Sequence, residues 1–236
     1  MDIFGKALLG YYNGQTDIPL KVLRDDGWTD EHSPGLYFQD APFEFEVPAL
    51  RRISGPTLDV GCGAGRHLRW LAAEGHEAVG LDSSEGAVAV CRAQGLTGVN
   101  AVDVLSDPLP ELPLRPAQIT LFGNNVGIGG TFDGSVTLLR ILHGICGAGG
   151  QLLLTGLNVK GTENPTHVAY QERNLAAGRR RGELKLRLSY EGETGPEFGW
   201  FHPEPHELEE LAALSGWGVE HLEHQGRFFW ASLRAR

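Results

Sequence analysis

The residues that decide the fold read TLDVGCGAGRH, from residue 57 to residue 67. A short apolar run leads into a glycine turn, and a segment of helical period begins near Arg66. Gly61, Gly63 and Gly65 have no side chain and adopt left-handed backbone angles easily, so a ligand can approach the backbone closely. A strand, a glycine loop and a helix in this order predict a ligand-binding turn of an α/β fold, with a purely structural turn as the alternative.

Strands and helices alternate along residues 57–157. Five apolar runs indicate buried strands, which we expect at Thr57–Gly61, Glu77–Asp82, Val99–Asp103, Gln118–Phe122 and Gln151–Gly156. An amphipathic helix precedes the last run, with apolar residues at i, i+3, i+4 and i+7. Four prolines between residues 108 and 116 exclude a long helix before the fourth strand. The alternation predicts an α/β fold with a Rossmann-like, mostly parallel sheet.

The composition of the 236 residues favours a globular protein that repels polyanions. Hydrophobic residues make up 41% of the chain, and 30 acidic against 20 basic residues give a net charge of −10. This charge disfavours nucleic acids and anionic membranes as partners. The 3 cysteines lack the CxxC spacing of zinc sites, and their odd number argues against a disulfide framework. With no leader-like segment and no long apolar run, we expect a cytoplasmic protein.

Three aspartates stand at or near the ends of the first three expected strands. Asp59 precedes the glycine loop, Asp82 lies 21 residues after Gly61, and a further 21 residues lead to Asp103. Because parallel strands end at one edge of a sheet, we expect these carboxylates to face one crevice. Nicotinamide-binding folds also place an acid about 20 residues downstream, so Asp82 leaves both cofactor classes open. Arg66 stands where their GxGxxG loop has its third glycine, which makes a dinucleotide oxidoreductase the alternative.

The chain resembles the class I methyltransferases that use S-adenosylmethionine. The resemblance covers roughly residues 55–157 and the final helix and hairpin, and LDVGCGAG is the family's signature loop. It implies S-adenosylmethionine as the cofactor, S-adenosylhomocysteine as the product, and a seven-stranded sheet that ends in an antiparallel hairpin. Two β-rich runs joined at Gln225-Gly226 fit that hairpin.

The resemblance also implies the cofactor contacts. Asp59 and the glycine loop would surround the amino acid end, Asp82 would hold both ribose hydroxyls, and Asp103 would lie beside the adenine amino group. A carboxylate fits these places because it accepts several hydrogen bonds at once. Val104 and Phe122 would supply apolar contact, although ordinary core roles suit them equally. The expected cofactor-binding residues are Asp59, Gly61, Cys62, Gly63, Gly65, Arg66, Asp82, Ser83, Asp103, Val104 and Phe122.

The fourth expected strand ends in LFGNNVGIGG, residues 121–130, where the family places the residues nearest the transferable methyl group. This segment lacks the (D/N)PP(Y/F) tetrad of DNA amino methyltransferases, which argues against a base-flipping enzyme. Its GNN run is similar to the GNS turn of glycine and sarcosine N-methyltransferases. We therefore expect Asn124 to contact the acceptor, with a simple Asx turn as the alternative.

Two further residues are candidates for acceptor binding. Arg173 lies on a possible helix around residues 167–177, on the same face as Tyr170, and its guanidinium could clamp a carboxylate. An exposed arginine paired with Glu172 or with water is the alternative. Tyr11, in the aromatic N-terminal segment, is expected to line an acceptor chamber. The catalytic candidates are thus Asn124, Arg173 and Tyr11.

We expect a single domain over residues 1–236, made of an N-terminal cap (1–50), a cofactor-binding core (51–157), a lid and hairpin insert (158–202), and a final helix and hairpin (203–236). The cap and the insert would roof the acceptor chamber. The aromatic residues of the cap could equally cover the outer face of the sheet.

These observations predict an S-adenosylmethionine-dependent methyltransferase that acts on a small molecule, and its arginine-rich composition favours an acceptor from bacterial specialised metabolism. A non-catalytic protein that binds S-adenosylmethionine is the alternative beside the NAD(P)-dependent oxidoreductase. No metal is expected, because prolines interrupt the segment that holds His202 and His206. The identity of the acceptor atom and the oligomeric state stay open.

Overall fold

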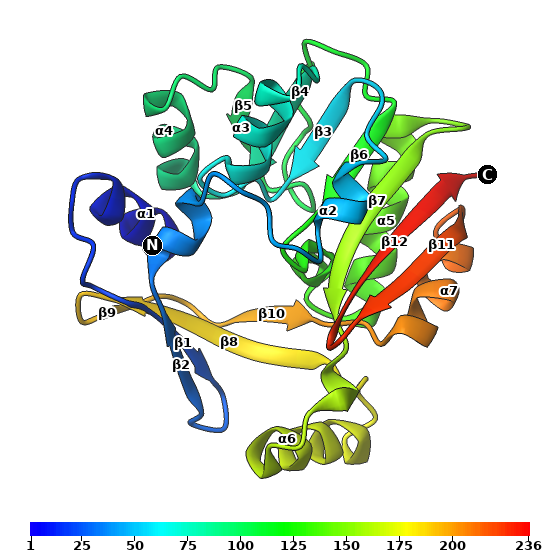
Figure 1. The fold of residues 1–236 in the computed structure, drawn as a ribbon. Helices are drawn as coiled ribbons and strands as arrows, with labels where there is room; N and C mark the ends of the chain where they lie inside the picture. Colours follow the sequence, from blue (N-terminus) through cyan, green and yellow to red (C-terminus); the bar gives the residue numbers. More distant parts are fainter. The chain divides into compact units, whose positions relative to one another are not determined.

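The computed structural model describes residues 1–236, and the chain forms two compact units (Figure 1). The first unit consists of Met1–Pro42, Pro56–Arg115 and Lys185–Phe198. The second consists of Phe43–Gly55, Pro116–Leu184 and Gly199–Arg236. No helix of the protein combines the length and the apolar character needed to cross a membrane.

The first unit contains three parallel strands with crossover helices. The strands are β3 (Thr57–Val60), β4 (Ala78–Asp82) and β5 (Val99–Ala101). Their crossover helices are α3 (Arg66–Ala73) and α4 (Glu85–Ala93). Every residue of β3 is buried, as expected for a strand that is covered on both faces. The register pairs Leu58 with Val79 and Gly80 with Val99, which confirms the parallel order predicted for this part of the chain.

The N-terminal segment of the first unit has more structure than its sequence indicated. It contains helix α1 (Ile3–Tyr12), the antiparallel strands β1 (Leu20–Arg24) and β2 (Thr29–His32), and the 3₁₀ helix η1 (Pro34–Phe38). Helix α1 lies beside α4 (Figure 1). The two strands were not expected, because the TDEH sequence of β2 has no apolar alternation.

A second sheet joins segments that are far apart in sequence. Its strands β8 (Glu183–Tyr190), β9 (Glu193–Thr194) and β10 (Phe198–Phe201) come from the expected insert. The order is β10-β8-β1-β2, with β9 paired to β8. Strand β8 therefore pairs with β1, for example Leu188 opposite Val22. The expected cap and insert thus both contribute strands to one sheet, and the expected domain boundaries stay a prediction.

The second unit carries the remaining strands of the main sheet. Strands β6 (Gln118–Leu121) and β7 (Gln151–Leu157) are parallel, whereas β12 (Phe228–Ala235) is antiparallel to β7 and to β11 (Trp217–Gln225). The predicted C-terminal hairpin is thus confirmed. The helical elements of this unit are α2 (Val47–Leu50), α5 (Phe132–Cys146), α6 (Pro165–Ala176), α7 (Pro205–Leu214), η2 (Asn125–Gly129) and η3 (Val159–Gly161).

The main sheet has seven strands in the order β11-β12-β7-β6-β3-β4-β5. It is mostly parallel and ends in the antiparallel hairpin, so the predicted Rossmann-like fold class is confirmed. No helix occurs between β5 and β6, as the four prolines of that segment predicted. This topology brings the loops that follow β3 and β4 to the carboxyl ends of neighbouring parallel strands, where α/β proteins bind ligands.

Candidate cofactor site

The glycine loop between β3 and α3 has a backbone that requires glycine. Gly61, Gly63 and Gly65 have φ angles of 74°, 54° and 78°, all in the left-handed region. The amide of Gly61 donates to the carbonyl of Leu81 at 2.8 Å, and the amide of Gly65 donates to the carbonyl of Cys62 at 2.9 Å. The loop is therefore a fixed turn whose outer face carries no side chains at these three positions.

Cys62 of this loop directs its thiol into the core instead of toward a ligand. It is 5% exposed and belongs to a buried cluster that includes Leu68 and Cys91. A hydrogen bond with Cys91, together with burial, raises the pKa of the Cys62 thiol. A Cβ at Gly65 would displace the side chain of Leu96, and the left-handed backbone angle of this residue also favours glycine. A contact of Cys62 with a cofactor would have to come from its backbone.

Asp82, at the end of β4, fastens the glycine loop. Its Oδ2 accepts the amide of Gly63 at 2.8 Å, and its Oδ1 accepts the amide of Ser84 at 2.9 Å. The carboxyl group is 8% exposed, and burial raises its pKa to about 6, against the lowering effect of the two amides. Each carboxylate oxygen can accept a further hydrogen bond, since it has two lone pairs. The structure thus brings Asp82 and Gly63 together, and leaves acceptor capacity for the hydroxyls of a ribose.

The serine that organises the loop after β4 is Ser84, not the predicted Ser83. Ser83 is exposed, whereas Ser84 is 7% exposed and caps α4 by accepting the amide of Ala87 at 2.9 Å. The Ser84 hydroxyl donates to Asp2 at 2.8 Å. The Ser-Glu sequence at the start of α4 is a pattern that predicts a helix cap at Ser84. No sequence pattern predicts the contact between Asp2 and Ser84. The cofactor role of Ser83 stays a prediction.

Asp59 lies inside β3 and is almost fully buried. It is 1% exposed, and its Oδ2 lies 4.0 Å from Nδ1 of His67 in the first turn of α3. Arg66, the first residue of α3, is 8% exposed. The strand, the loop and the helix N-terminus therefore gather one acid and two basic side chains around the glycine turn. Their contacts with the amino acid end of a cofactor stay predictions.

Asp103 follows β5 by two residues and holds its own turn. Its Oδ1 accepts the amide of Leu105 at 3.0 Å, and its Oδ2 accepts the hydroxyl of Ser106 at 2.6 Å. This is the local hydrogen bonding that aspartate provides in turns. Val104 beside it is 5% exposed. The adenine contacts predicted for both residues are compatible with this arrangement and stay predictions.

Tyr11 packs within the N-terminal segment. Its ring stacks on Phe38 with centroids 4.9 Å apart, and its hydroxyl lies over Gly35 of η1. The ring is half-buried. This packing gives Tyr11 a role in joining α1 to η1, and its predicted role toward an acceptor stays a prediction.

The second unit contains the other predicted residues, beginning with those that follow β6. Phe122 is 1% exposed. Asn124 has a φ of 66°, unusual for a residue other than glycine, and its Oδ1 is buried without a hydrogen bond. Such strain and an unsatisfied buried acceptor are features that functional sites retain. An Asx turn through this oxygen is therefore not formed, and the acceptor contact of Asn124 stays a prediction.

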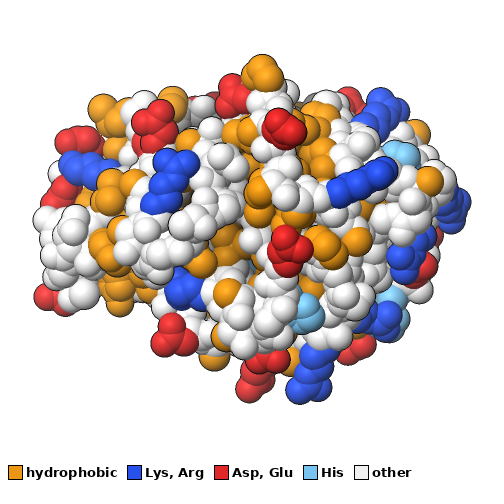
Figure 2. Space-filling view, turned by 90° about the horizontal axis from the view of Figure 1, so that it is seen from above, with side chains coloured by type: hydrophobic (Ala, Val, Ile, Leu, Met, Phe, Trp, Pro, Cys, Tyr) orange, Lys and Arg blue, Asp and Glu red, His pale blue; other side chains and the backbone are white.

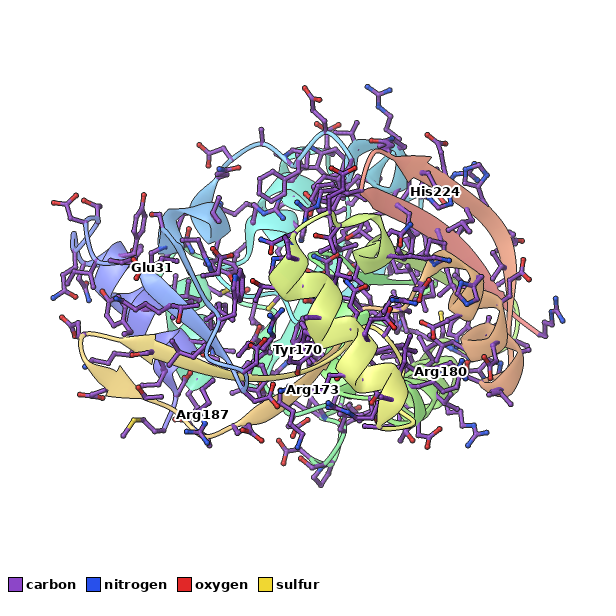
Figure 3. All side chains as sticks on the ribbon, turned by 90° about the horizontal axis from the view of Figure 1, so that it is seen from below. Glu31, Tyr170, Arg173, Arg180, Arg187 and His224 are labelled. Carbon is purple, nitrogen blue, oxygen red and sulfur yellow. The ribbon has the colours of Figure 1, made fainter.

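Helix α6 presents the predicted Arg173. Its guanidinium lies over the ring of Tyr170, 4.5 Å from the ring centroid, and both residues are labelled together on this helix in Figure 3. Tyr170 is 3% exposed, whereas Arg173 is exposed. Asn174 fastens the end of the helix, because its amide donates to the carbonyl of Glu183 at 2.6 Å. Of these three polar residues, Arg173 is the exposed one, and its predicted acceptor role stays a prediction.

Comparison with known proteins finds one family that matches part of the chain. A family model described as a methyltransferase domain matches residues 57–125. The chain is similar to this family over residues 57–125. The match covers β3, the glycine loop, Asp82 and Asn124, and no curated protein matches the chain.

Solved structures of methyltransferases have the same fold as the chain. An S-adenosylmethionine-dependent methyltransferase from Bacteroides fragilis, crystallised with S-adenosylhomocysteine, has a TM-score of 0.84 and 23% identity over 100% of this chain and 95% of its own. CalS10 from Micromonospora echinaspora is an amino pentose methyltransferase of calicheamicin biosynthesis. It has a TM-score of 0.50 and 20% identity, and the match covers 80% of this chain and 87% of CalS10. The O-methyltransferase NcsB1 from neocarzinostatin biosynthesis has a TM-score of 0.52 and 21% identity, and the match covers 77% of this chain and 49% of NcsB1.

The family match and the shared fold confirm the resemblance to class I S-adenosylmethionine-dependent methyltransferases, and with it the expected enzyme class. Within the first unit the structure joins the glycine loop to Asp82, and surrounds it with Asp59 and Arg66. The acceptor residues Asn124 and Arg173 belong to the second unit.

Proposed function

We propose that this methyltransferase transfers the methyl group of S-adenosylmethionine to a small molecule of bacterial specialised metabolism. The observation that carries the proposal is the pairing of Asp82 with the amide of Gly63 at 2.8 Å. This bond fixes a side-chain-free loop beside a carboxylate that retains acceptor capacity. A ligand with a vicinal diol and a flexible polar tail fits both features at once.

The residues present fit S-adenosylmethionine. Asp82 would accept from the ribose hydroxyls, and the left-handed glycines leave room for the methionine portion against the loop. Arg66 offers a positive charge at the start of α3 for the carboxylate of the cofactor. When bound, S-adenosylmethionine supplies a sulfonium methyl group that is already electrophilic. The chain therefore has to orient the acceptor and exclude water, and needs a base only for a protonated nucleophile.

A small acceptor is supported by the composition and by the neighbours. A net charge of −10 opposes a polyanionic substrate, and Figure 2 shows basic side chains dispersed among acidic ones on the face that it draws. CalS10 acts on an amino pentose, and NcsB1 was crystallised with 1,4-dihydroxy-2-naphthoic acid. Both neighbours belong to natural product biosynthesis, which favours the same class of acceptor here.

Asn124 and Arg173 are the residues that we assign to the acceptor. The Oδ1 of Asn124 has no hydrogen-bond partner and can accept a hydrogen bond from the nucleophile of the acceptor. The amide side chain carries no charge. The guanidinium of Arg173 can bind a carboxylate with two parallel hydrogen bonds, which makes an anionic acceptor the preferred class. Tyr11 is assigned a place in the wall of the acceptor chamber.

The decisive experiment measures S-adenosylhomocysteine formed when the protein is incubated with S-adenosylmethionine and a panel of small amines, phenols and carboxylic acids. Turnover with one member of the panel supports the proposal. Binding of S-adenosylmethionine without turnover on any acceptor would favour the non-catalytic alternative. Binding of NADH instead of S-adenosylmethionine would favour the oxidoreductase.

A further inference from the structure

The glycine loop is held on its carbonyl side by side chains of α3 and α4. The thiol of Cys91 in α4 donates to the carbonyl of Gly63 at 3.1 Å. Nε2 of Gln94, the residue that ends α4, donates to the carbonyl of Ala64 at 2.9 Å. Nη1 of Arg69 in α3 donates to the same carbonyl at 3.0 Å and to Oε1 of Gln94 at 2.9 Å. Two consecutive carbonyls of the loop are therefore fixed by the protein itself.

Arg69 also fastens the N-terminal segment to the loop. Its Nη2 donates to the carbonyls of Phe38 and Gln39 at 3.0 Å and 3.3 Å, at the end of η1. The side chain is 21% exposed, whereas the carboxylate paired with it, that of Asp40, is fully exposed and lies 4.0 Å from Nε. A largely buried charge is costly unless its donors are satisfied, so the backbone carbonyls stabilise this guanidinium. One side chain thus joins η1 to the glycine loop.

The segment that Arg69 holds lies next to the loop at Gly63. A Cβ placed on Gly63 would lie 3.6 Å from Cδ1 of Tyr37, which belongs to η1. The amide of Gly63 is bonded to Asp82, the carboxylate that we expect to hold the ribose. The space beside Gly63 therefore depends on the bonds that Arg69 makes to both segments.

A loop with three glycines has to be ordered before it can hold a ligand. Glycine has more backbone freedom than any other residue, and this freedom is lost on ordering. Because a trans peptide group is planar, a fixed carbonyl also fixes the direction of the amide that follows it. The bonds to the carbonyls of Gly63 and Ala64 therefore orient the next two amides independently of a ligand. Such ordering improves affinity, since less entropy is lost on binding.

We propose that Arg69 and Gln94 are positioning residues for the cofactor, which hold the glycine loop and η1 in the arrangement that receives S-adenosylmethionine. They act through the carbonyls of Ala64 and Phe38 and not through a contact with the cofactor. The inference rests on the proposed function, because it requires the cofactor to lie on the glycine loop. It assigns the two side chains a part in binding that goes beyond the stability of the fold.

The test is calorimetric titration of S-adenosylmethionine and of S-adenosylhomocysteine into the wild type, Arg69→Met and Gln94→Ala. Methionine keeps an apolar stem and removes the guanidinium. We expect Arg69→Met to raise both Kd values by the same factor of about ten, and Gln94→Ala by about threefold. Arg69→Lys should lie between wild type and Arg69→Met, because an ammonium group lacks the fork that reaches both carbonyls.

Arg92→Met is the matched control. Arg92 is also in α4, and its Nη2 donates to a backbone carbonyl away from the loop, that of Val99, at 2.9 Å. This variant should unfold at a lower temperature than wild type but change either Kd by less than about twofold. A loss of global stability alone does not alter the Kd of the folded protein, so the two readouts separate positioning from a purely structural role.

The double variant Arg69→Met, Gln94→Ala supplies a second readout. Because both side chains hold one carbonyl, we expect its Kd values to rise by about tenfold in total, where independent effects would multiply to roughly thirtyfold. A full multiplication would overturn the shared role.

Wild-type affinity in Arg69→Met would overturn the proposal, and so would equal losses in Arg69→Met and Arg92→Met. Different factors for the two ligands would indicate a direct contact and would also overturn it. If Arg69→Met fails to fold, as circular dichroism would show, Arg69→Lys and Gln94→Ala decide, and both must bind more weakly than Arg92→Met. A wild type that binds neither ligand would contradict the proposed function itself, which separates that failure from failure of the positioning role.

Discussion

At the scale of single residues, Asp82 connects folding of the loop with cofactor binding. Its carboxylate holds the amides of Gly63 and Ser84 while it is buried. Removing it deletes these acceptors and both expected bonds to the ribose. We expect Asp82→Ala to weaken S-adenosylmethionine binding by about 1.5–3 kcal/mol, as measured by calorimetry. Wild-type affinity in a folded Asp82→Ala variant would remove Asp82 from the cofactor site.

The raised pKa of Asp82 gives cofactor binding a pH dependence with a definite sign. Above about pH 6 the carboxyl group is ionised and accepts hydrogen bonds with both oxygens. As the pH falls through this value the group takes up a proton, loses acceptor capacity and binds the ribose less well. We expect the Kd of S-adenosylmethionine to rise about tenfold between pH 7 and pH 5, as calorimetry at both values would measure. A Kd that is constant over this range, or that falls, would contradict the assignment.

Gly63 combines a left-handed φ of 54° with the close approach of Tyr37 and Phe4. A β-branched residue adopts this backbone angle at a cost of about 1–2 kcal/mol and would direct its methyl groups into the ligand space. Gly63→Val should therefore abolish S-adenosylmethionine binding, while circular dichroism shows a folded protein. Normal binding by this variant would mean that the loop is a structural turn only.

At the scale of elements, helix α6 provides the test of acceptor recognition. Arg173→Ala should lower kcat/KM for the true acceptor by about tenfold or more, roughly 1.4 kcal/mol, with cofactor affinity nearly unchanged. Arg173→Lys should restore only part of the activity, because a point charge lacks the planar fork. Arg179→Ala, three residues beyond the end of the helix, is the control for general loss of charge. Equal kinetics for wild type and Arg173→Ala would return Arg173 to a surface role.

Docking of α1 on α4 is the other element-scale feature that can be measured. Asp2→Ala deletes three hydrogen bonds to Gly5, Ser84 and Gly86. We expect it to lower the free energy of unfolding by about 1–3 kcal/mol in denaturant titrations, since both helices lose an N-terminal acceptor. Wild-type stability of this variant would show that the contact between Gly5 and Gly86 is sufficient to hold α1.

The elements that the sequence predicted are those with local patterns. Strands β3, β4, β6 and β7 are short apolar runs, and the glycine loop has its own spacing. Strand β1 was missed because its partner β8 lies more than 150 residues away, and such pairing leaves no local period. Strand β2 pairs with β1 and was missed because its TDEH sequence has no apolar alternation. Asp2, Phe4 and Tyr37 were missed as a group, since only the folded chain brings them to the loop.

At the scale of the whole molecule, residues 57–125 match the methyltransferase family, and the N-terminal segment and helix α6 lie outside that match. The motifs that resemble the family lie in the expected cofactor-binding residues. The cofactor could therefore be predicted from the sequence in more detail than the acceptor. Tyr11 and Arg173, which we propose for the acceptor, lie in segments that have no sequence pattern indicating a substrate.

The central claim is that the chain binds S-adenosylmethionine through the glycine loop and Asp82. Its most direct test is calorimetric titration of S-adenosylmethionine and NADH, in parallel, into wild type and Asp82→Ala at pH 7.5. The account predicts that wild type binds S-adenosylmethionine with one site per chain, that Asp82→Ala binds it at least tenfold more weakly, and that neither binds NADH. NADH binding by wild type without S-adenosylmethionine binding would contradict the account.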